Sequence, residues 1–355
     1  MKKHIKQAFQ ISLITLVLLF IVDQFLAFLK PNALYPQHYD ISDYHRAPKP
    51  YIGFSGKQDV LDHNEFGYRW EIDKGTDNTY FKIAFFGGST GYDGDPPIAT
   101  LLENYLKSEF GEQIKVANFS VVSSNHRQHI HNIIESNSLF KPDLIVFYGG
   151  YNETAQHAFY DPRPGYPYNF YYRDETSHWR KLLLERSPTA NLLNRVGTKT
   201  GLFDLTPLSK LREDVDLEAA NGRRKLGLFT QVEEPVYSEA WKTEVLKTYF
   251  ETLSYANVLA NALGSSRCSE HFKFRAFYQP YQIPDNLKSL DSEIRRDLRA
   301  VSYIYDVSDA FVGRDDVYTD IVHVTQEGNE IMAQKMFNLL KAEKNILSCL
   351  EKISK

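Results

Sequence analysis

The sequence predicts an α/β domain in which a parallel β-sheet is covered by helices on both faces. From residue 80 onward, short β-prone apolar runs alternate with segments of helical periodicity, and strands separated by helices of this length pair in parallel. Two of the runs end abruptly in glycine pairs, Gly87-Gly88 and Gly149-Gly150. Such turns are expected at the carboxyl edge of the sheet, where open α/β folds bind their ligands.

The predicted strands are apolar and aromatic runs that end at Gly, Pro or polar turns. They cover residues 81–86, 114–119, 143–148, 272–278 and 303–307. The predicted helices have apolar residues on one face, and the first of them stops at Gly111. They cover residues 98–110, 127–139, 241–263 and 326–347.

An insertion over residues 154–236 interrupts this alternation with aromatics, prolines and charges that follow no clear period. It leaves from the carboxyl edge of the predicted sheet, so we expect it to form a cap over the site. Its aromatic side chains either stack on sugar rings or build a small core for the cap, and the second interpretation is the simpler one. They are Tyr160, Tyr166, Tyr168, Phe170, Tyr171, Tyr172 and Trp179.

The N-terminus joins a Lys-rich start to an apolar run, which is typical of a membrane-targeting segment. Residues 11–29 are long enough for a transmembrane anchor, which needs about 17–25 residues, whereas 11–22 alone would suit a cleaved signal peptide. Asp23 disfavours the anchor, because an acid near the bilayer centre costs about 2.5–3.5 kcal/mol. No small-x-small cleavage site follows the run, so we favour an uncleaved single-pass anchor.

The predicted organisation therefore has three parts: a cytoplasmic start with the membrane anchor (residues 1–30), a linker and N-terminal extension (31–79), and the main domain (80–350). The positive charges before the apolar run place the main domain outside the cytoplasm, on the periplasmic side.

Composition excludes some partners. The net charge is −4 and the sequence pI is near 6.3, so no basic field is available to bind a nucleic-acid backbone. Two cysteines are too few for a metal cluster. Three histidines (126, 129 and 131) hint at a metal site, but no further ligand has suitable spacing, and we expect them to be solvated on a helix.

Three short segments carry residues suited to acyl transfer. Ser89 follows a strand in a Gly-rich turn that would expose its hydroxyl at a helix N-terminus. Asn152 lies just after the third strand, where its amide could donate to an oxyanion. Asp320 and His323 are three residues apart in a loop, so the carboxylate can orient the imidazole as a general base. Each segment alone could be an ordinary turn, but their order and shared edge are hard to explain that way.

In these blocks the sequence resembles the SGNH/GDSL hydrolase superfamily, roughly over residues 80–340 outside the insertion. The segment 64–69, Asn-Glu-Phe-Gly-Tyr-Arg, is similar to one in membrane-anchored members of the group. The resemblance implies a flavodoxin-like doubly wound sheet without cofactor or metal. It also implies that Ser89 is the nucleophile, that Asp320 and His323 activate it, and that Gly88 and Gly150 support the site.

The sequence departs from the family pattern at two positions. Ser123 stands where the family has a glycine whose backbone N–H serves the oxyanion hole, together with Ser89 N–H and the Asn152 amide. A serine keeps the N–H but loses conformational freedom. Glu153 replaces the usual Asp, and we expect it to brace the loop after Gly150.

The two cysteines are expected to form a disulfide. The closing helix runs away from the carboxyl edge and would bring Cys349 to the opposite edge, where the strand after Cys268 begins. An extracytoplasmic location would permit oxidation.

Together these features predict a serine-dependent esterase or O-acyltransferase, most simply of O-acetyl groups, that acts on an acylated cell-envelope glycan. The alternative is a catalytically idle relative that binds polysaccharide or an assembly partner, since Ser123 and Glu153 depart from the pattern. A Rossmann-type nucleotide binder is disfavoured, because residues 87–91 lack the G-x-G-x-x-G spacing.

Overall fold

The structure is a computed structural model. It describes residues 2–29, 46–58, 62–69, 79–159, 163–167, 183, 187–203, 236–263 and 273–353. The chain forms two compact units. One comprises residues 1–44 and 170–228, and the other comprises 45–169 and 229–355.

The larger unit is built on a five-stranded sheet in the order β4-β3-β5-β6-β7, with every neighbouring pair parallel. The strands are β3 (Phe81–Gly87), β4 (Ile114–Asn118), β5 (Leu144–Gly149), β6 (Phe274–Tyr278) and β7 (Ile304–Asp306). In chain order this is the 2-1-3-4-5 arrangement of doubly wound, flavodoxin-like sheets. The predicted fold class is therefore confirmed, and each predicted strand is present.

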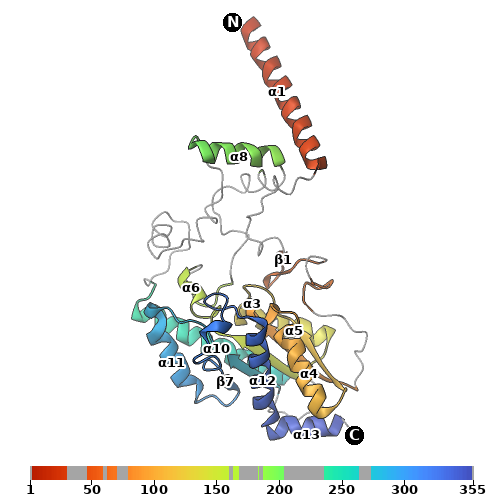
Figure 1. Cartoon of the computed structure of the whole chain (residues 1–355), viewed down its shortest axis with the longest axis vertical. Helices are drawn as coiled ribbons and strands as arrows, with labels where there is room; N and C mark the ends of the chain where they lie inside the picture. Colours follow the sequence, from red (N-terminus) through yellow and green to blue (C-terminus); the bar gives the residue numbers. More distant parts are fainter. Residues whose placement is uncertain are drawn as a thin grey trace. The chain divides into compact units, whose positions relative to one another are not determined.

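Helices cover both faces of the sheet (Figure 1). On one face, α4 (Ile98–Phe110) packs against α12 (Gln326–Lys341), and α13 (Lys344–Ile353) follows α12. On the other, α5 (His126–Leu139) packs against α10 (Glu239–Leu263). Successive side chains of β3 point to opposite faces of the sheet, as in any strand. Phe85 joins the hydrophobic core under α4 and α12, whereas Phe86 stacks on Phe119 under α5.

The predicted helices are present, although the closing one differs from its prediction, and three helices of the described residues were not predicted. The predicted closing helix 326–347 is two helices, because α12 ends at Lys341 and α13 begins at Lys344. Helix α11 (Lys288–Leu298), which buries only Leu290, Asp291, Ile294 and Leu298, was not predicted. Within the insertion, the short α6 (Gln156–Phe159) and the longer α8 (Pro188–Thr200) were not predicted either.

An antiparallel hairpin precedes the sheet and was also unpredicted. Strands β1 (Arg46–Lys49) and β2 (Gly53–Gly56) pair with each other, and Gly56 N–H donates to the Gly67 carbonyl at 3.0 Å. Gly67 has φ +82°, and a Cβ there would lie 2.2 Å from the Gly56 carbonyl oxygen. Only glycine fits this crossing, which fixes the segment 62–69 against the hairpin.

The smaller unit contains α1 (Lys2–Leu29) and α8. Within α1, residues 10–29 have a mean hydropathy of 2.4 and are long and apolar enough to cross a membrane. Asp23 accepts hydrogen bonds from the Ser187 hydroxyl at 2.7 Å and from Thr189 N–H at 3.0 Å. The carboxylate of α1 thus satisfies donors at the N-terminus of α8, where the helix dipole favours a negative charge.

Candidate active site

Ser89 begins the four-residue helix α3 (Ser89–Tyr92) directly after β3. Neighbouring groups approach this turn so closely that side chains are excluded. A Cβ on Gly88 would lie 2.2 Å from Asn152 Nδ2, and one on Gly91 would lie 2.6 Å from Ser120 Oγ. The glycines let the chain turn sharply at the strand end and leave the Ser89 side chain partly exposed.

A continuous hydrogen-bonded relay joins the three residues that the sequence singled out. Ser89 Oγ lies 2.7 Å from His323 Nε2, and His323 Nδ1 lies 2.6 Å from Asp320 Oδ2. A carboxylate can only accept, so Nδ1 carries the proton and Nε2 is free to accept from the serine hydroxyl. The relay has the geometry required of a general base that activates a serine.

Asp320 is held in place by its own loop. Its Oδ1 accepts the backbone N–H groups of Val322 at 2.8 Å and His323 at 2.7 Å. Partial burial raises the pKa of Asp320, but these two donors and the His323 side chain outweigh it and leave the pKa below its ordinary value. The carboxylate is therefore charged at neutral pH and can stabilise an imidazolium on His323.

The first turn of α12 brings the His323 loop to the Ser89 turn. The Gln326 side chain accepts Asp95 N–H and donates to the Pro96 carbonyl, both at 3.0 Å. Asn329 Nδ2 donates to the Asp93 carbonyl at 3.2 Å. Sequence reasoning identified the helix but missed these contacts, because their partners lie more than 200 residues away.

Arg69, the last residue of the segment 64–69, secures the same loop from the other side. Its guanidinium donates to the carbonyls of Tyr92 and Gly94, each at 2.6 Å, and forms an ion pair with Asp62. This gives a physical role at the site to a segment that the sequence related only to membrane-anchored members of the superfamily.

Asp93 is a further group at the site that sequence reasoning missed, although it follows directly on the Ser89 helix. Its Oδ2 lies 3.7 Å from His323 Nε2. Partial burial raises the pKa of Asp93, and the attraction of His323 and Arg69 opposes that rise. A second carboxylate thus stands beside the imidazole nitrogen that faces Ser89.

The predicted oxyanion-hole residues lie around the same turn. Asn152 Nδ2 donates to the Ser124 carbonyl at 2.7 Å, and it adjoins Gly88. Ser123, in the loop between β4 and α5, has φ +62°, in the left-handed region that favours glycine. This conformation suits the position at which the resemblance implies a glycine. The donor roles of Ser89 N–H, Ser123 N–H and the Asn152 amide stay predictions.

Glu153 connects the loop after β5 to the start of α5. Its buried carboxylate accepts Gly150 N–H at 2.6 Å and His126 N–H at 2.8 Å. Gly150 has φ +150°, and a Cβ there would lie 2.7 Å from the Tyr278 ring. The contacts are those expected of a brace. Burial raises the pKa of Glu153 to about 7, although the backbone donors oppose the rise.

We expect Glu153→Gln to change how stability depends on pH. The folded-state pKa of about 7 lies above the ordinary 4.5, so between these values the folded chain keeps a proton that the unfolded chain has lost. The free energy of unfolding should therefore fall with rising pH, by about 1.4 kcal/mol per unit from this group. Glutamine does not titrate, so the variant lacks this loss of stability. The free energy of unfolding of the variant should therefore rise relative to that of the parent, by on the order of 3 kcal/mol between about pH 4.5 and 7.

Urea unfolding at pH 5, 6, 7 and 8 would measure this difference. A hydrogen bond weakened by the amide would add an offset that is the same at every pH, so the slope is the quantity to compare. If the free energies of unfolding of the two proteins changed equally with pH, the expected result would be contradicted.

The expectation of solvated helix histidines is wrong for two of the three. His126 and His129 are fully buried with Nδ1 atoms 3.2 Å apart, and only His131 is exposed. His129 Nε2 lies 2.9 Å from Ser124 Oγ. Burial lowers the pKa of His129 to about 3 and that of His126 well below its ordinary value, so both are neutral and serve the core under α5. No group of three or more metal-ligating side chains occurs within the described ranges.

Cys349 is buried on α13 and is disulfide-bonded. Cys268 lies outside the described residues, so the Cys268–Cys349 pairing stays a prediction. Of the seven aromatic residues named for the insertion, Tyr166 is described, and the other six lie outside the described residues. The cap role likewise stays a prediction.

No protein-family model and no curated protein matches the chain. Among solved structures, it is similar to the lipase Lip_vut3 from a goat rumen metagenome, with 14% identity and a TM-score of 0.41 over 72% of this chain and 95% of the lipase. A member of the lipolytic G-D-S-L family from Veillonella parvula has 14% identity and a TM-score of 0.38, over 74% of this chain and 99% of that one. The acetyl xylan esterase AlAXEase has 12% identity and a TM-score of 0.39, over 73% and 98% respectively. At this distance, the roles of the site residues rest on geometry.

Proposed function

We propose that the chain is a serine-dependent enzyme of the SGNH/GDSL type that cleaves or transfers ester-linked acyl groups. The observation that carries the proposal is the relay from Asp320 through His323 to Ser89, with distances of 2.6 and 2.7 Å. These three residues come from two distant parts of the chain, and separate side-chain contacts hold both loops in place. If the three side chains met only by chance, there would be no reason for other side chains to hold their two loops together.

The proposed reaction has two steps. Ser89 Oγ attacks the ester carbonyl carbon while its proton passes to His323 Nε2, and the carbonyl oxygen becomes an oxyanion held by the proposed donors. Collapse of this intermediate expels the alcohol, which takes the proton from His323 and leaves an acyl group on Ser89. Water, or a hydroxyl of an acceptor, then attacks the acyl carbon and gives its proton to His323. Collapse releases the acid, or a new ester, and restores Ser89.

An acylated glycan is the substrate class that we propose, with acetyl as the simplest acyl group. The catalytically idle alternative has less support than it had from sequence. Ser123 adopts the glycine-like conformation, and Glu153 holds Gly150 N–H as a brace should. Both departures are thus compatible with an active site.

A fluorophosphonate ester tests the nucleophile directly. The probe should phosphonylate Ser89 when it is incubated with the full-length chain in detergent, and peptide mass mapping should find the adduct on the peptide that contains residue 89. Because these probes need an activated serine, protein that is denatured before the probe is added should form no adduct. No adduct, or one on another serine, would contradict the proposal.

We also propose that α1 is an uncleaved membrane anchor and that the sheet domain lies on the extracytoplasmic side. The Asp23 carboxylate, which disfavoured the anchor, accepts two hydrogen bonds at the start of α8, and these lower the cost of its burial. The intact mass of the membrane-extracted protein should include residues 1–30, and the protein should remain in the membrane pellet after alkaline carbonate treatment. A mature chain that starts after the apolar run would show that the segment is a cleaved signal peptide.

A further inference from the structure

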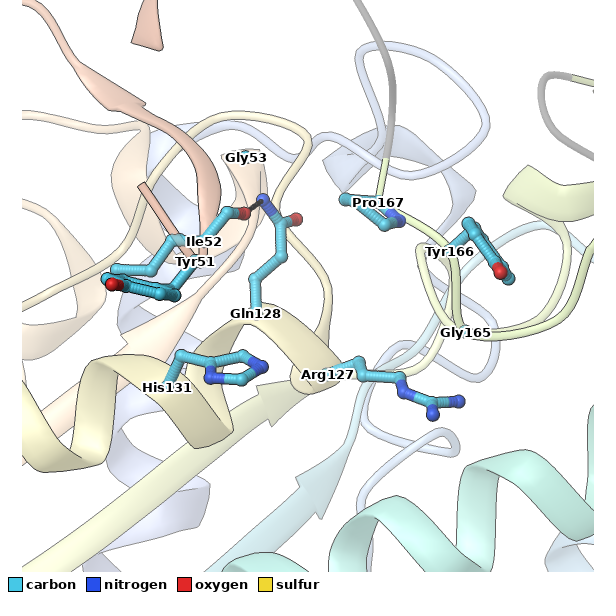
Figure 2. A pocket seen from close by; sticks show the side chains of 9 residues that line it. All are labelled: Tyr51, Ile52, Gly53, Arg127, Gln128, His131, Gly165, Tyr166 and Pro167. Carbon is cyan, nitrogen blue, oxygen red and sulfur yellow. Dashed lines mark hydrogen bonds between the residues drawn. The ribbon is translucent and has the colours of Figure 1, made fainter. Parts of the chain in front are cut away.

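A pocket of about 220 Å³ lies at the N-terminal half of α5, outside the Ser89 relay (Figure 2). Tyr51 and His131 stand on one side, Arg127 and Tyr166 stand on the other, and Gln128 and Pro167 lie between them. The volume is below the roughly 300–1,000 Å³ typical of sites for drug-sized ligands, so one ring-sized unit is the appropriate occupant.

The pocket has a fixed frame, which the capping box of α5 provides. Asn125 caps the helix and donates through Nδ2 to the Tyr166 carbonyl at 2.9 Å. Gln128 completes the capping box and donates through Nε2 to the Ile52 carbonyl at 2.8 Å. The same two side chains therefore start the helix and hold both loops that border the pocket.

The frame also connects the pocket to the proposed active site. Asn125 directly follows Ser124, whose carbonyl accepts the Asn152 amide. The loop 123–125 thus carries a proposed oxyanion donor at one end and the border of the pocket at the other. A polymer with one unit in the pocket could present a neighbouring unit to Ser89.

The charge in the pocket favours an anion. Arg127 and His131 are exposed, and no side chain in the described part of the chain pairs with either of them. None of the described lining residues is acidic. An unpaired guanidinium presents a planar fork that fits a carboxylate with two parallel hydrogen bonds.

The aromatic residues favour a ring. Tyr51 is 92% exposed and Tyr166 is 48% exposed, so both offer ring surface to a ligand. Arg163 stacks on Tyr166 at 3.7 Å and holds that side chain in place. Tyr51 has φ +66°, a conformation that a bulky residue adopts at a cost and a glycine adopts freely. A strained and fully exposed tyrosine contributes nothing to the core, which points to a role in binding.

We propose that this pocket binds a carboxylate-bearing sugar unit, a hexuronate, of the acylated glycan. Arg127 binds the carboxylate, His131 donates to a ring substituent, and the two tyrosines contact the sugar ring. The proposal rests on the proposed function, which it deepens by naming an acidic polysaccharide as the substrate class.

Calorimetric titration of the full-length protein in detergent tests the proposal. The acidic probes are tetramers of galacturonate and mannuronate and a hyaluronan tetrasaccharide, and cellotetraose is the neutral control. At least one acidic probe should bind at least about tenfold more tightly than cellotetraose. Arg127→Gln should weaken that binding by about tenfold or more, whereas Arg299→Gln, which changes an exposed arginine directly after α11, should leave it unchanged.

Tyr51→Gly separates a binding role from a structural one. It should weaken binding of the same probe several-fold without lowering the free energy of unfolding, because glycine relieves the strained φ. The proposal is overturned if no acidic tetramer binds better than cellotetraose, or if Arg127→Gln and Arg299→Gln bind alike. Titration does not require turnover, so hydrolysis of an aryl acetate without uronate binding rejects only the pocket. Arg127-dependent binding without hydrolysis supports the pocket and rejects the proposed function.

Discussion

Ser89→Ala should lower kcat for hydrolysis of p-nitrophenyl acetate by about 10⁴-fold or more and leave KM nearly unchanged. The variant keeps the His323–Asp320 pair but has no oxygen to attack the ester, so the acyl-enzyme cannot form. The lost side chain is small, partly exposed and bonded only to His323 among the contacts that the structure gives it. The fold should therefore survive, as near-ultraviolet circular dichroism and thermal unfolding would show.

Ser292→Ala is the matched control. Ser292 is exposed on α11, and its hydroxyl donates to the Lys288 carbonyl of its own helix. It should hydrolyse the ester at the parent rate. Equal rates for the parent and Ser89→Ala would show that the observed hydrolysis does not use this site and would reject the enzymatic proposal.

Asn152→Ala should lower kcat by about 10²–10³-fold, with a smaller effect on KM. An amide nitrogen carries two hydrogens, and one of those on Asn152 goes to the Ser124 carbonyl. The other is available to stabilise charge that develops on the substrate oxygen next to Ser89. Because that charge is greatest in the transition state, its loss should appear mainly in kcat.

Gly88→Ala perturbs the same amide without removing it. The added Cβ would lie 2.2 Å from Asn152 Nδ2, so the amide must move. We expect a decrease in kcat of the same order as in Asn152→Ala. Asn338→Ala, at an exposed position on α12, should have no effect. Parent-like kcat in Asn152→Ala would exclude this residue from the oxyanion hole.

The strands were predictable because most of the sheet is buried, so its strands are short runs rich in apolar and aromatic residues, in which single charged residues such as Lys82 and Arg275 are exceptions. Helix α4 was predictable to the residue, since its apolar face is regular and Gly111 ends it with φ +96°. Helix α11 was missed because it is mainly polar and buries its apolar residues only at i, i+4 and i+8, namely Leu290, Ile294 and Leu298. The spacing of these three residues is helical, but the other residues of α11 are polar, and a polar stretch of this length is easily taken for a loop.

At the site, too, residues that stand in a local sequence pattern were predictable, and residues that act through distant contacts were not. Ser89, Asp320 and His323 stand in local patterns, a Gly-rich turn and a three-residue spacing, that chemistry makes recognisable. Arg69, Gln326 and Asn329 hold those residues together, but each bonds to backbone carbonyls or N–H groups far along the chain. Backbone groups are present at every residue, so nothing in the sequence marks the partner. Such contacts can be recognised only after the chain is folded.

Strands β5 and β6 lie side by side in register, with Gly149 opposite Tyr278, although the long segment between them includes the insertion. Ser89, Asp320 and His323 all lie outside that segment. The proposed oxyanion donor Asn152 and the pocket residues Tyr166 and Pro167 are all near the start of that segment, and α10 is at its end. A descendant of this chain could therefore change the stretch between Pro167 and α10 in length and composition without replacing a residue of the relay, the proposed oxyanion hole or the proposed pocket.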